Sequence, residues 1–222
     1  MRPLWAHFLQ GVAWLAAAGG AQAADMIVLQ YVDQDPGGPP YPTRILVTPD
    51  FLRMDSGEDA GDFTLLDRRR HVAINVMHES RLAMVFAPGL LPPKPADWDA
   101  RIDAGEPVRG GRRYTLTLKG LVCSEGIAAR YAMDAARAMG ELKAVLAATQ
   151  YRVWKATPPD LQHDCDLANH VWESGTTLRL GLPLEERDFT GRTRRLEHEG
   201  REPLDPALFR VPEGMAQIDA PS

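Results

Sequence analysis

The segment from His163 to His170 concentrates side chains that could do chemistry. Its sequence, His-Asp-Cys-Asp-Leu-Ala-Asn-His, places two histidines, two aspartates, a cysteine and an asparagine within eight residues. If the segment is helical, His163, Asp166 and His170 share one face at steps of three and four. Imidazole and carboxylate groups in that arrangement could hold zinc or copper, or could act as an acid–base pair. The alternative is a connector anchored at Cys165, whose polar side chains cap turns and satisfy backbone groups.

The two cysteines bear on that choice. Cys123 and Cys165 are the only cysteines in the chain, and 42 residues separate them. An even cysteine number in an exported chain favours a disulfide. A metal thiolate or a reactive thiol is the alternative, although the chain has no CxxC or CxxCH motif. A bridged Cys165 could not act as a metal ligand, so the disulfide weakens the metal hypothesis.

Other sequence signatures of catalysis are missing. The chain has no GxSxG, GxGxxG, P-loop, HExxH or SxxK motif. Catalytic triads can still be assembled in space from distant residues. The sequence therefore favours a protein that is not an enzyme, and it assigns no cofactor.

Alternating apolar residues predict a sheet that could line a ligand cavity. Val72, Ile74 and Val76 share one face of a predicted strand, and similar alternation recurs over residues 26–118 and 177–182. A curved sheet of this kind could enclose an acyl chain. The residues we expect to line such a cavity are Met84, Phe86, Trp98 and Tyr114. The same apolar residues would equally make an ordinary filled core.

Between these strands the sequence predicts one long loop and one long helix. Residues 88–111 are rich in proline and glycine and contain Trp98, which could cover a pocket or fix the loop to the core. Residues 127–155 repeat apolar residues at steps of three and four, which predicts an amphipathic helix. Its many alanines suggest close packing on the sheet. Pro158-Pro159 would end it.

The two ends of the sequence are expected to lie outside the fold. Residues 1–23 resemble a secretory signal, with Arg2, an apolar stretch too short to span a bilayer, and an Ala21-Gln22-Ala23 cleavage site. We therefore expect a periplasmic or secreted protein with no transmembrane segment in the mature chain. Residues 24–213 would form a single β-rich domain, and residues 214–222 a flexible tail.

Composition and charge exclude several classes. The chain is 45% hydrophobic and 25% charged, which is typical of globular proteins rather than of disordered or fibrous ones. Its formal net charge is −5, which argues against nucleic acid as the main partner.

Short motifs resemble the periplasmic LolA and LolB family of lipoprotein carriers. The segment 43–55 contains a strand, a turn and a second strand that reads Arg53-Met54-Asp55. The strands at 63–67 and 72–76 that follow resemble the family's successive hairpins. Residues 181–184 and 204–214 are similar to the family's closing segment. The resemblance implies a half-open antiparallel barrel and carriage of a lipid or lipoprotein. The long helix and the cysteine pair depart from that pattern, and no functional residue of the carriers can be matched here.

Taken as a whole, the sequence predicts a mainly β protein with a curved antiparallel sheet, or half-open β-barrel, and one main packed helix. We expect a non-enzymatic protein that binds an apolar or lipid-like ligand or an envelope protein partner. The first alternative is a metal-binding or metal-dependent protein that uses His163, Asp166 and His170. The second is a structural cell-envelope protein without a ligand.

Overall fold

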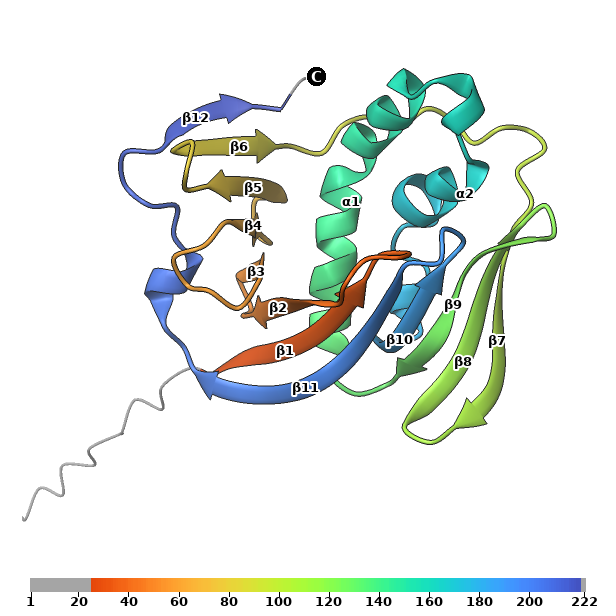
Figure 1. Ribbon diagram of the computed structural model, residues 1–222, viewed down its shortest axis with the longest axis horizontal. Helices are drawn as coiled ribbons and strands as arrows, with labels where there is room; N and C mark the ends of the chain where they lie inside the picture. The colour runs from red at the N-terminus through yellow and green to blue at the C-terminus, as the bar shows by residue number, and fades with distance from the viewer. Residues whose placement is uncertain (1–24, 221–222) are drawn as a thin grey trace, which may run out of the picture.

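The computed structural model describes residues 25–220, which form one curved sheet around a long helix (Figure 1). The predicted signal segment lies outside the described residues. The strands are β1 (Asp25–Gln34), β2 (Tyr41–Val47), β3 (Phe51–Asp55), β4 (Phe63–Asp67), β5 (Val72–Met77), β6 (Leu82–Phe86), β7 (Ala100–Val108), β8 (Gly111–Leu118), β9 (Leu121–Ala129), β10 (Leu182–Asp188), β11 (Thr193–Pro203) and β12 (Ala216–Asp219).

The helical elements lie between β9 and β10, apart from one short turn near the end of the chain. The main helices are α1 (Met133–Ala156) and α2 (Asp164–Leu167). A π-turn, η2 (Ala168–Trp172), follows α2 directly. Three short 3-10 turns complete the set: η1 (Pro159–Leu161), η3 (Thr177–Arg179) and η4 (Pro206–Phe209). Within residues 25–220, no helix is both long and apolar enough to cross a bilayer.

The twelve strands form a single open sheet in the order β12-β6-β5-β4-β3-β2-β1-β11-β10-β9-β8-β7. Neighbouring strands are antiparallel except for β12, which pairs with β6 in parallel. The prediction of a mainly β fold with one packed helix is therefore confirmed. The sheet is mixed rather than purely antiparallel, and it does not close into a barrel.

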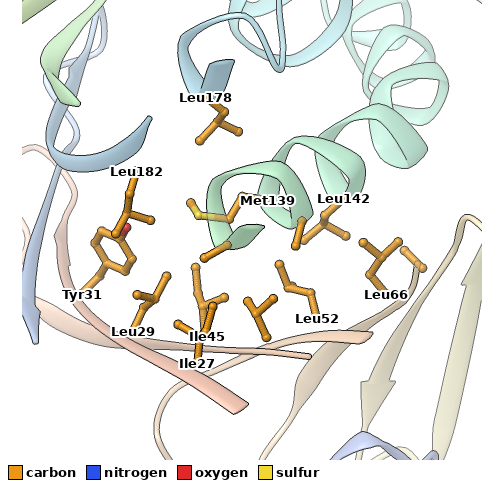
Figure 2. Packing of buried hydrophobic residues seen from close by; sticks show 14 of the residues in the cluster. Ile27, Leu29, Tyr31, Ile45, Leu52, Leu66, Met139, Leu142, Leu178 and Leu182 are labelled. Carbon is orange, nitrogen blue, oxygen red and sulfur yellow. The ribbon is translucent and has the colours of Figure 1, made fainter. Parts of the chain in front are cut away.

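Helix α1 fills the concave side of the sheet, where it packs against the inward side chains of β1 to β5 (Figures 1 and 2). The buried face of the helix includes five alanines, which let its backbone approach the strands closely. Fully buried Leu29, Leu52 and Leu66 meet this face. The sequence left open whether the sheet holds a cavity or a filled core; the helix fills most of the concave side.

A second core lies on the opposite face of the sheet. Met26 and Val28 of β1 pack there with Leu46, Phe63 and Val76, and Phe209 of the segment after β11 covers them. Strand β1 is thus buried on both faces, which explains its nearly continuous apolar sequence.

An ion-pair cluster joins the sheet to α1. Arg68, 9% exposed, donates to Glu141 at 2.7 Å, to Asp134 at 3.1 and 3.2 Å, and to the Thr48 carbonyl at 2.7 Å. The helix begins after Ala132 and ends at Ala156, with Thr157 as its C-cap, just before the predicted stop at Pro158.

Four segments differ from the sequence predictions. Residues 127–129 belong to β9, because Ile127 pairs with both β8 and β10, so α1 begins later than expected. The predicted loop 88–111 contains edge strand β7, whose bulge between Ala104 and Pro107 accommodates the proline. In the predicted strand at 177–182, Thr177–Arg179 form a 3-10 turn and the strand begins only at Leu182. The expected flexible tail includes β12, which is held by backbone hydrogen bonds to β6.

Candidate functional site

A row of inward-facing side chains turns one end of the concave face from apolar to polar. On β1 the inward residues are Ile27, Leu29 and Tyr31, followed by Asp33, and on β10 they change from Leu182 to Glu186 and Asp188. These three carboxylates line a common space with residues of α1, so they lie on the helix side of the sheet.

The register places four of these side chains in one line across the sheet. Asp33 is paired with Arg194, Arg194 with Glu186, Glu186 with Gly126, and Gly126 with Tyr114, over strands β1, β11, β10, β9 and β8. We call Asp33, Arg194, Glu186 and Tyr114 the polar row.

Hydrogen bonds fix the geometry of the polar row. Arg194 makes a bidentate contact to Asp33 with both distances at 2.7 Å, and Thr43 donates to the same carboxylate at 2.7 Å. Burial of Asp33 opposes its charge, but the hydrogen bonds from Arg194 and Thr43 lower its pKa overall. Asp33 is therefore a buried carboxylate that stays charged.

Tyr114 closes the other end of the row. Its hydroxyl donates to Glu186 at 2.8 Å. The contact requires a glycine at position 126, because a Cβ there would lie 2.8 Å from the Tyr114 hydroxyl. Burial, and then the Glu186 carboxylate, raise the pKa of Tyr114, so the phenol keeps its proton and donates to Glu186.

A cleft of about 250 Å³ runs between this row and α1. Partly buried Met54 and Leu146 line its apolar part together with Leu142, while Lys143 and His170 line its polar part. The remaining lining residues come from the sheet and from the inner face of α1: Asp33, Ile45, Leu52, Met139, Glu186, Asp188, Arg192, Thr193 and Arg194. The cleft therefore has apolar walls and one charged end, which suits an amphiphilic molecule.

His170 and Lys143 lie at the charged end of the cleft, on the helical side. Lys143 makes no ion pair with any residue between 25 and 220. Protein crowding around His170, and then the Lys143 ammonium, lower the pKa of His170 to about 4, against the opposing charges of Asp188 and Glu186. The imidazole is therefore neutral at physiological pH and can both donate and accept hydrogen bonds.

The metal-ligand candidates are not brought together. Across the described part of the chain, no group of three or more His, Cys, Asp or Glu side chains is placed to hold a metal ion. His163 precedes α2 with extended backbone and its ring lies against Phe189, whereas Asp166 lies in α2 and His170 in the π-turn η2. The prediction that these three side chains share one face assumed a single regular helix. The backbone instead changes from extended to α-helical to π-helical along the segment, so that shared face does not form.

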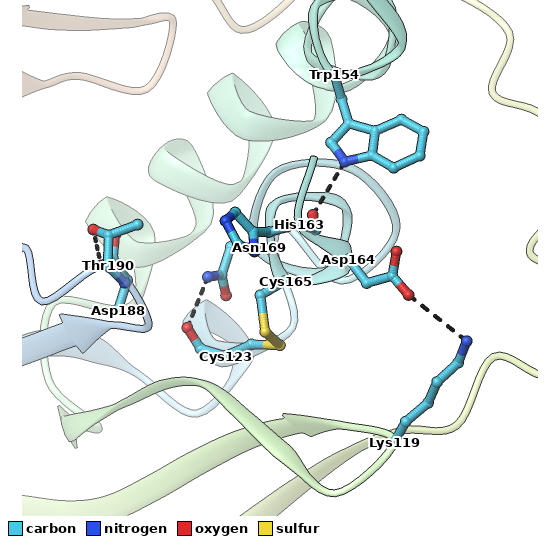
Figure 3. The surroundings of a disulfide bond; sticks show 9 residues. All are labelled: Lys119, Cys123, Trp154, His163, Asp164, Cys165, Asn169, Asp188 and Thr190. Carbon is cyan, nitrogen blue, oxygen red and sulfur yellow. Dashed lines mark hydrogen bonds and ion pairs between the residues drawn. A yellow bond between two sulfur atoms is a disulfide. The ribbon is translucent and has the colours of Figure 1, made fainter. Parts of the chain in front are cut away.

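The predicted disulfide is present. Cys123 of β9 and Cys165 of α2 are bonded, with Cα atoms 5.0 Å apart (Figure 3). Asn169 donates to the Cys123 carbonyl at 2.9 Å, so the segment 163–170 is tied to the sheet by a covalent bond and a buried hydrogen bond. This is the connector that the sequence offered as the alternative to a metal site.

The four predicted ligand-binding residues do not share a cavity. Phe86 packs against the α1 core, and Met84 is half-buried on the same strand. Trp98 fixes its loop: its indole donates to Glu173 at 3.2 Å and its ring meets Trp172 edge-on at 4.6 Å. None of the four lines the α1 cleft, although Tyr114 reaches it through Glu186.

Sequence reasoning missed Glu186, Asp188, Arg194 and Lys143. A signal was present in the sequence, because carboxylates follow Leu182 and Leu184 at two-residue steps and Arg194 precedes Leu196 at the same step. In the structure a bulge between Pro183 and Glu185 interrupts this alternation in β10. Charged residues in the inward phase of a strand indicate a polar end to the buried face.

No protein-family model matches the sequence, and comparison with curated proteins finds no match. Among solved structures, similar chains include an uncharacterized conserved protein from Thermus thermophilus, with a TM-score of 0.44 and 12% identity over 89% of this chain and 91% of that one. PNGF-II, in its P21 crystal form, has a TM-score of 0.38 and 11% identity over 89% of this chain. The chain spans only 32% of that PNGF-II chain. None of these descriptions names LolA or LolB, and likeness at this level assigns no function.

Proposed function

We propose that this chain is an exported, non-enzymatic binding protein that holds an apolar or lipid-like ligand in the cleft between α1 and the polar row. The observation that carries the proposal is the composition of this cleft, with Met54, Leu142 and Leu146 along its apolar part and Lys143 and His170 at its charged end. An amphiphile would bury its apolar body against the first group and hydrate or pair its head with the second.

Export is part of the same proposal. The Cys123–Cys165 disulfide supports it, because structural disulfides persist in oxidising compartments such as the periplasm. A carrier role related to LolA and LolB belongs to the proposal as well and rests on the sequence resemblance.

The cleft can be tested by filling it. In Leu146→Trp the larger ring would occupy the apolar part of the cleft, and Leu90→Trp is the matched control because Leu90 is fully exposed on the loop before β7. We expect Leu146→Trp to weaken binding of the uncharged fluorescent probe N-phenyl-naphthylamine at least about tenfold, and Leu90→Trp to leave it unchanged. Fluorescence titration measures the affinities, and thermal melts verify that both variants are folded.

Native mass spectrometry of protein purified gently from its own compartment provides the second test. We expect an apolar adduct on the wild type and less of it on Leu146→Trp. A wild-type protein that carries no adduct and shows no saturable probe binding would refute the proposal.

A further inference from the structure

A second cavity, of about 600 Å³, lies on a different face of α1 from the cleft. One wall is helix α1 and the other is the segment from Trp172 to Arg179. Its lining residues are Met133, Ala136, Arg137, Gly140, Glu141, Ala144, Trp172, Ser174, Gly175, Thr176, Leu178 and Arg179. The volume is within the range of small-molecule sites in proteins, about 300–1,000 Å³.

The cavity carries an excess of positive charge. Arg137 enters from α1 and Arg179 from the opposite wall, and neither makes an ion pair with another residue in the range 25–220. Glu141 also lines the cavity, but its carboxylate is already bound by Arg68 at 2.7 Å. Two guanidinium groups facing one space from both sides are suited to bind an anion.

The cavity has an aromatic lining residue, Trp172, and its ring is held in place. The Trp172 indole donates to the Pro92 carbonyl at 3.1 Å, and its ring contacts Trp98 at 4.6 Å and Tyr151 at 6.0 Å. A ring fixed on several sides loses little freedom when a ligand packs on it. The cavity thus offers a preformed apolar surface next to its charges.

The floor allows close approach and provides one polar group. Gly140 and Gly175 face each other, with a Cβ built at Gly175 lying 3.8 Å from the Gly140 Cα. Ser174, only 8% exposed, is among the lining residues. A serine hydroxyl at the cavity wall can donate a hydrogen bond to a bound ligand.

From these features we infer that this cavity is a binding site for a small organic anion with an aromatic or apolar body. The carboxylate, sulfonate or phosphate group of the ligand is held by Arg137 and Arg179, and its body lies on Trp172 above the small residues of α1. The site is separate from the α1 cleft and does not depend on the function proposed there.

Two fluorescent probes with the same ring system test the inference. Anilinonaphthalene sulfonate carries the anion, and N-phenyl-naphthylamine lacks it. We expect Arg137→Gln/Arg179→Gln to weaken sulfonate binding about tenfold or more while changing binding of the uncharged probe less than about twofold. Both arginines are exposed, so the fold is retained, which a thermal melt verifies. The sulfonate affinity of the wild type should also fall as salt is raised, because the contacts are ionic.

Variants that fill each cavity separate the two sites. Ala144→Trp, on the exposed side of α1, should remove sulfonate binding, and Leu146→Trp in the cleft should leave it within about twofold. Amide chemical shifts of Gly140 and Gly175 should move on titration with the sulfonate. Unchanged sulfonate affinity in Arg137→Gln/Arg179→Gln, or its loss in Leu146→Trp instead, would overturn the inference.

Discussion

At the scale of single residues, the charge of His170 in the cleft responds to pH. Its pKa is lowered to about 4 by surrounding protein atoms and by Lys143, with a smaller contribution from Arg192, while Asp188 and Glu186 act in the opposite direction. We predict that the ring protons of His170 titrate near pH 4 in the folded protein, as measured by NMR, and that Lys143→Met raises this midpoint.

The same shift has a consequence for stability. The folded pKa lies below the ordinary value of 6.5, so the unfolded state binds more protons between these two values. The contribution of His170 is therefore complete above pH 6.5 and is lost as the pH falls through about 4. His170→Gln should flatten the decline in the free energy of unfolding over this window. A midpoint at or above 6.5 would contradict both expectations.

The candidate site was only partly foreseeable at this scale. The cysteine pair could be predicted, because a chain with two cysteines that is expected to be exported leaves few options. His170 was chosen for a metal role, and it lies instead in a cleft beside Lys143. The polar row could not be assembled from the sequence, because Asp33 and Glu186 become neighbours of Arg194 only through the pairing of strands far apart in the chain.

At the scale of elements, Arg68 is the polar anchor between the sheet and α1. Arg68→Met would leave Asp134 and Glu141 without their cation and would cost about 2 kcal/mol, a drop in Tm of about 5 °C. The value lies below that of a fully buried pair because Asp134 is 44% exposed. Differential scanning calorimetry measures it.

The control for this variant is Arg70→Met, two residues along the same turn. Arg70 is exposed, and its side chain makes no ion pair within the described chain. It should melt within about 1 °C of the wild type, as surface substitutions usually do. Equal losses from the two arginines would show that Arg68 has no anchoring role.

The disulfide is the covalent anchor between elements. It closes a loop of 42 residues that contains all of α1. Cys123→Ala/Cys165→Ala should lower the free energy of unfolding by about 3–4 kcal/mol, since the open loop gains freedom in the unfolded state. Urea denaturation measures the loss. Alkylation of both thiols in the native protein without reductant would contradict the bridge itself.

The strands and the long helix were predictable as elements because their apolar periodicity follows from packing on one face. The residues at which these elements begin and end were harder to predict. The apolar pattern of α1 extends toward the N-terminus as far as Ile127. That residue nevertheless belongs to strand β9, because it pairs with both β8 and β10. Strand β7 was hidden by Gly105 and Pro107, which an edge strand tolerates through its bulge.

At the scale of the whole molecule, α1 divides the space inside the curved sheet. The buried face of the helix completes the core and also borders the cleft through Met139 and Leu142, and a different face borders the arginine-lined cavity. The two candidate sites therefore share one rigid element but no lining residue from it. Each can be altered through its own face of α1.

The position of β1 in the sheet sets an order of events for folding. This strand stands near the start of the chain, yet its partner β11 comes from residues 193–203. Until the ribosome has synthesised that stretch, one edge of β1 is unpaired. The pairing of β1 with β11, which joins the two halves of the curved sheet, is then still missing. Contacts so distant along the chain form slowly. If the chain is exported as proposed above, such a delay would keep it open long enough for an export machinery to thread it.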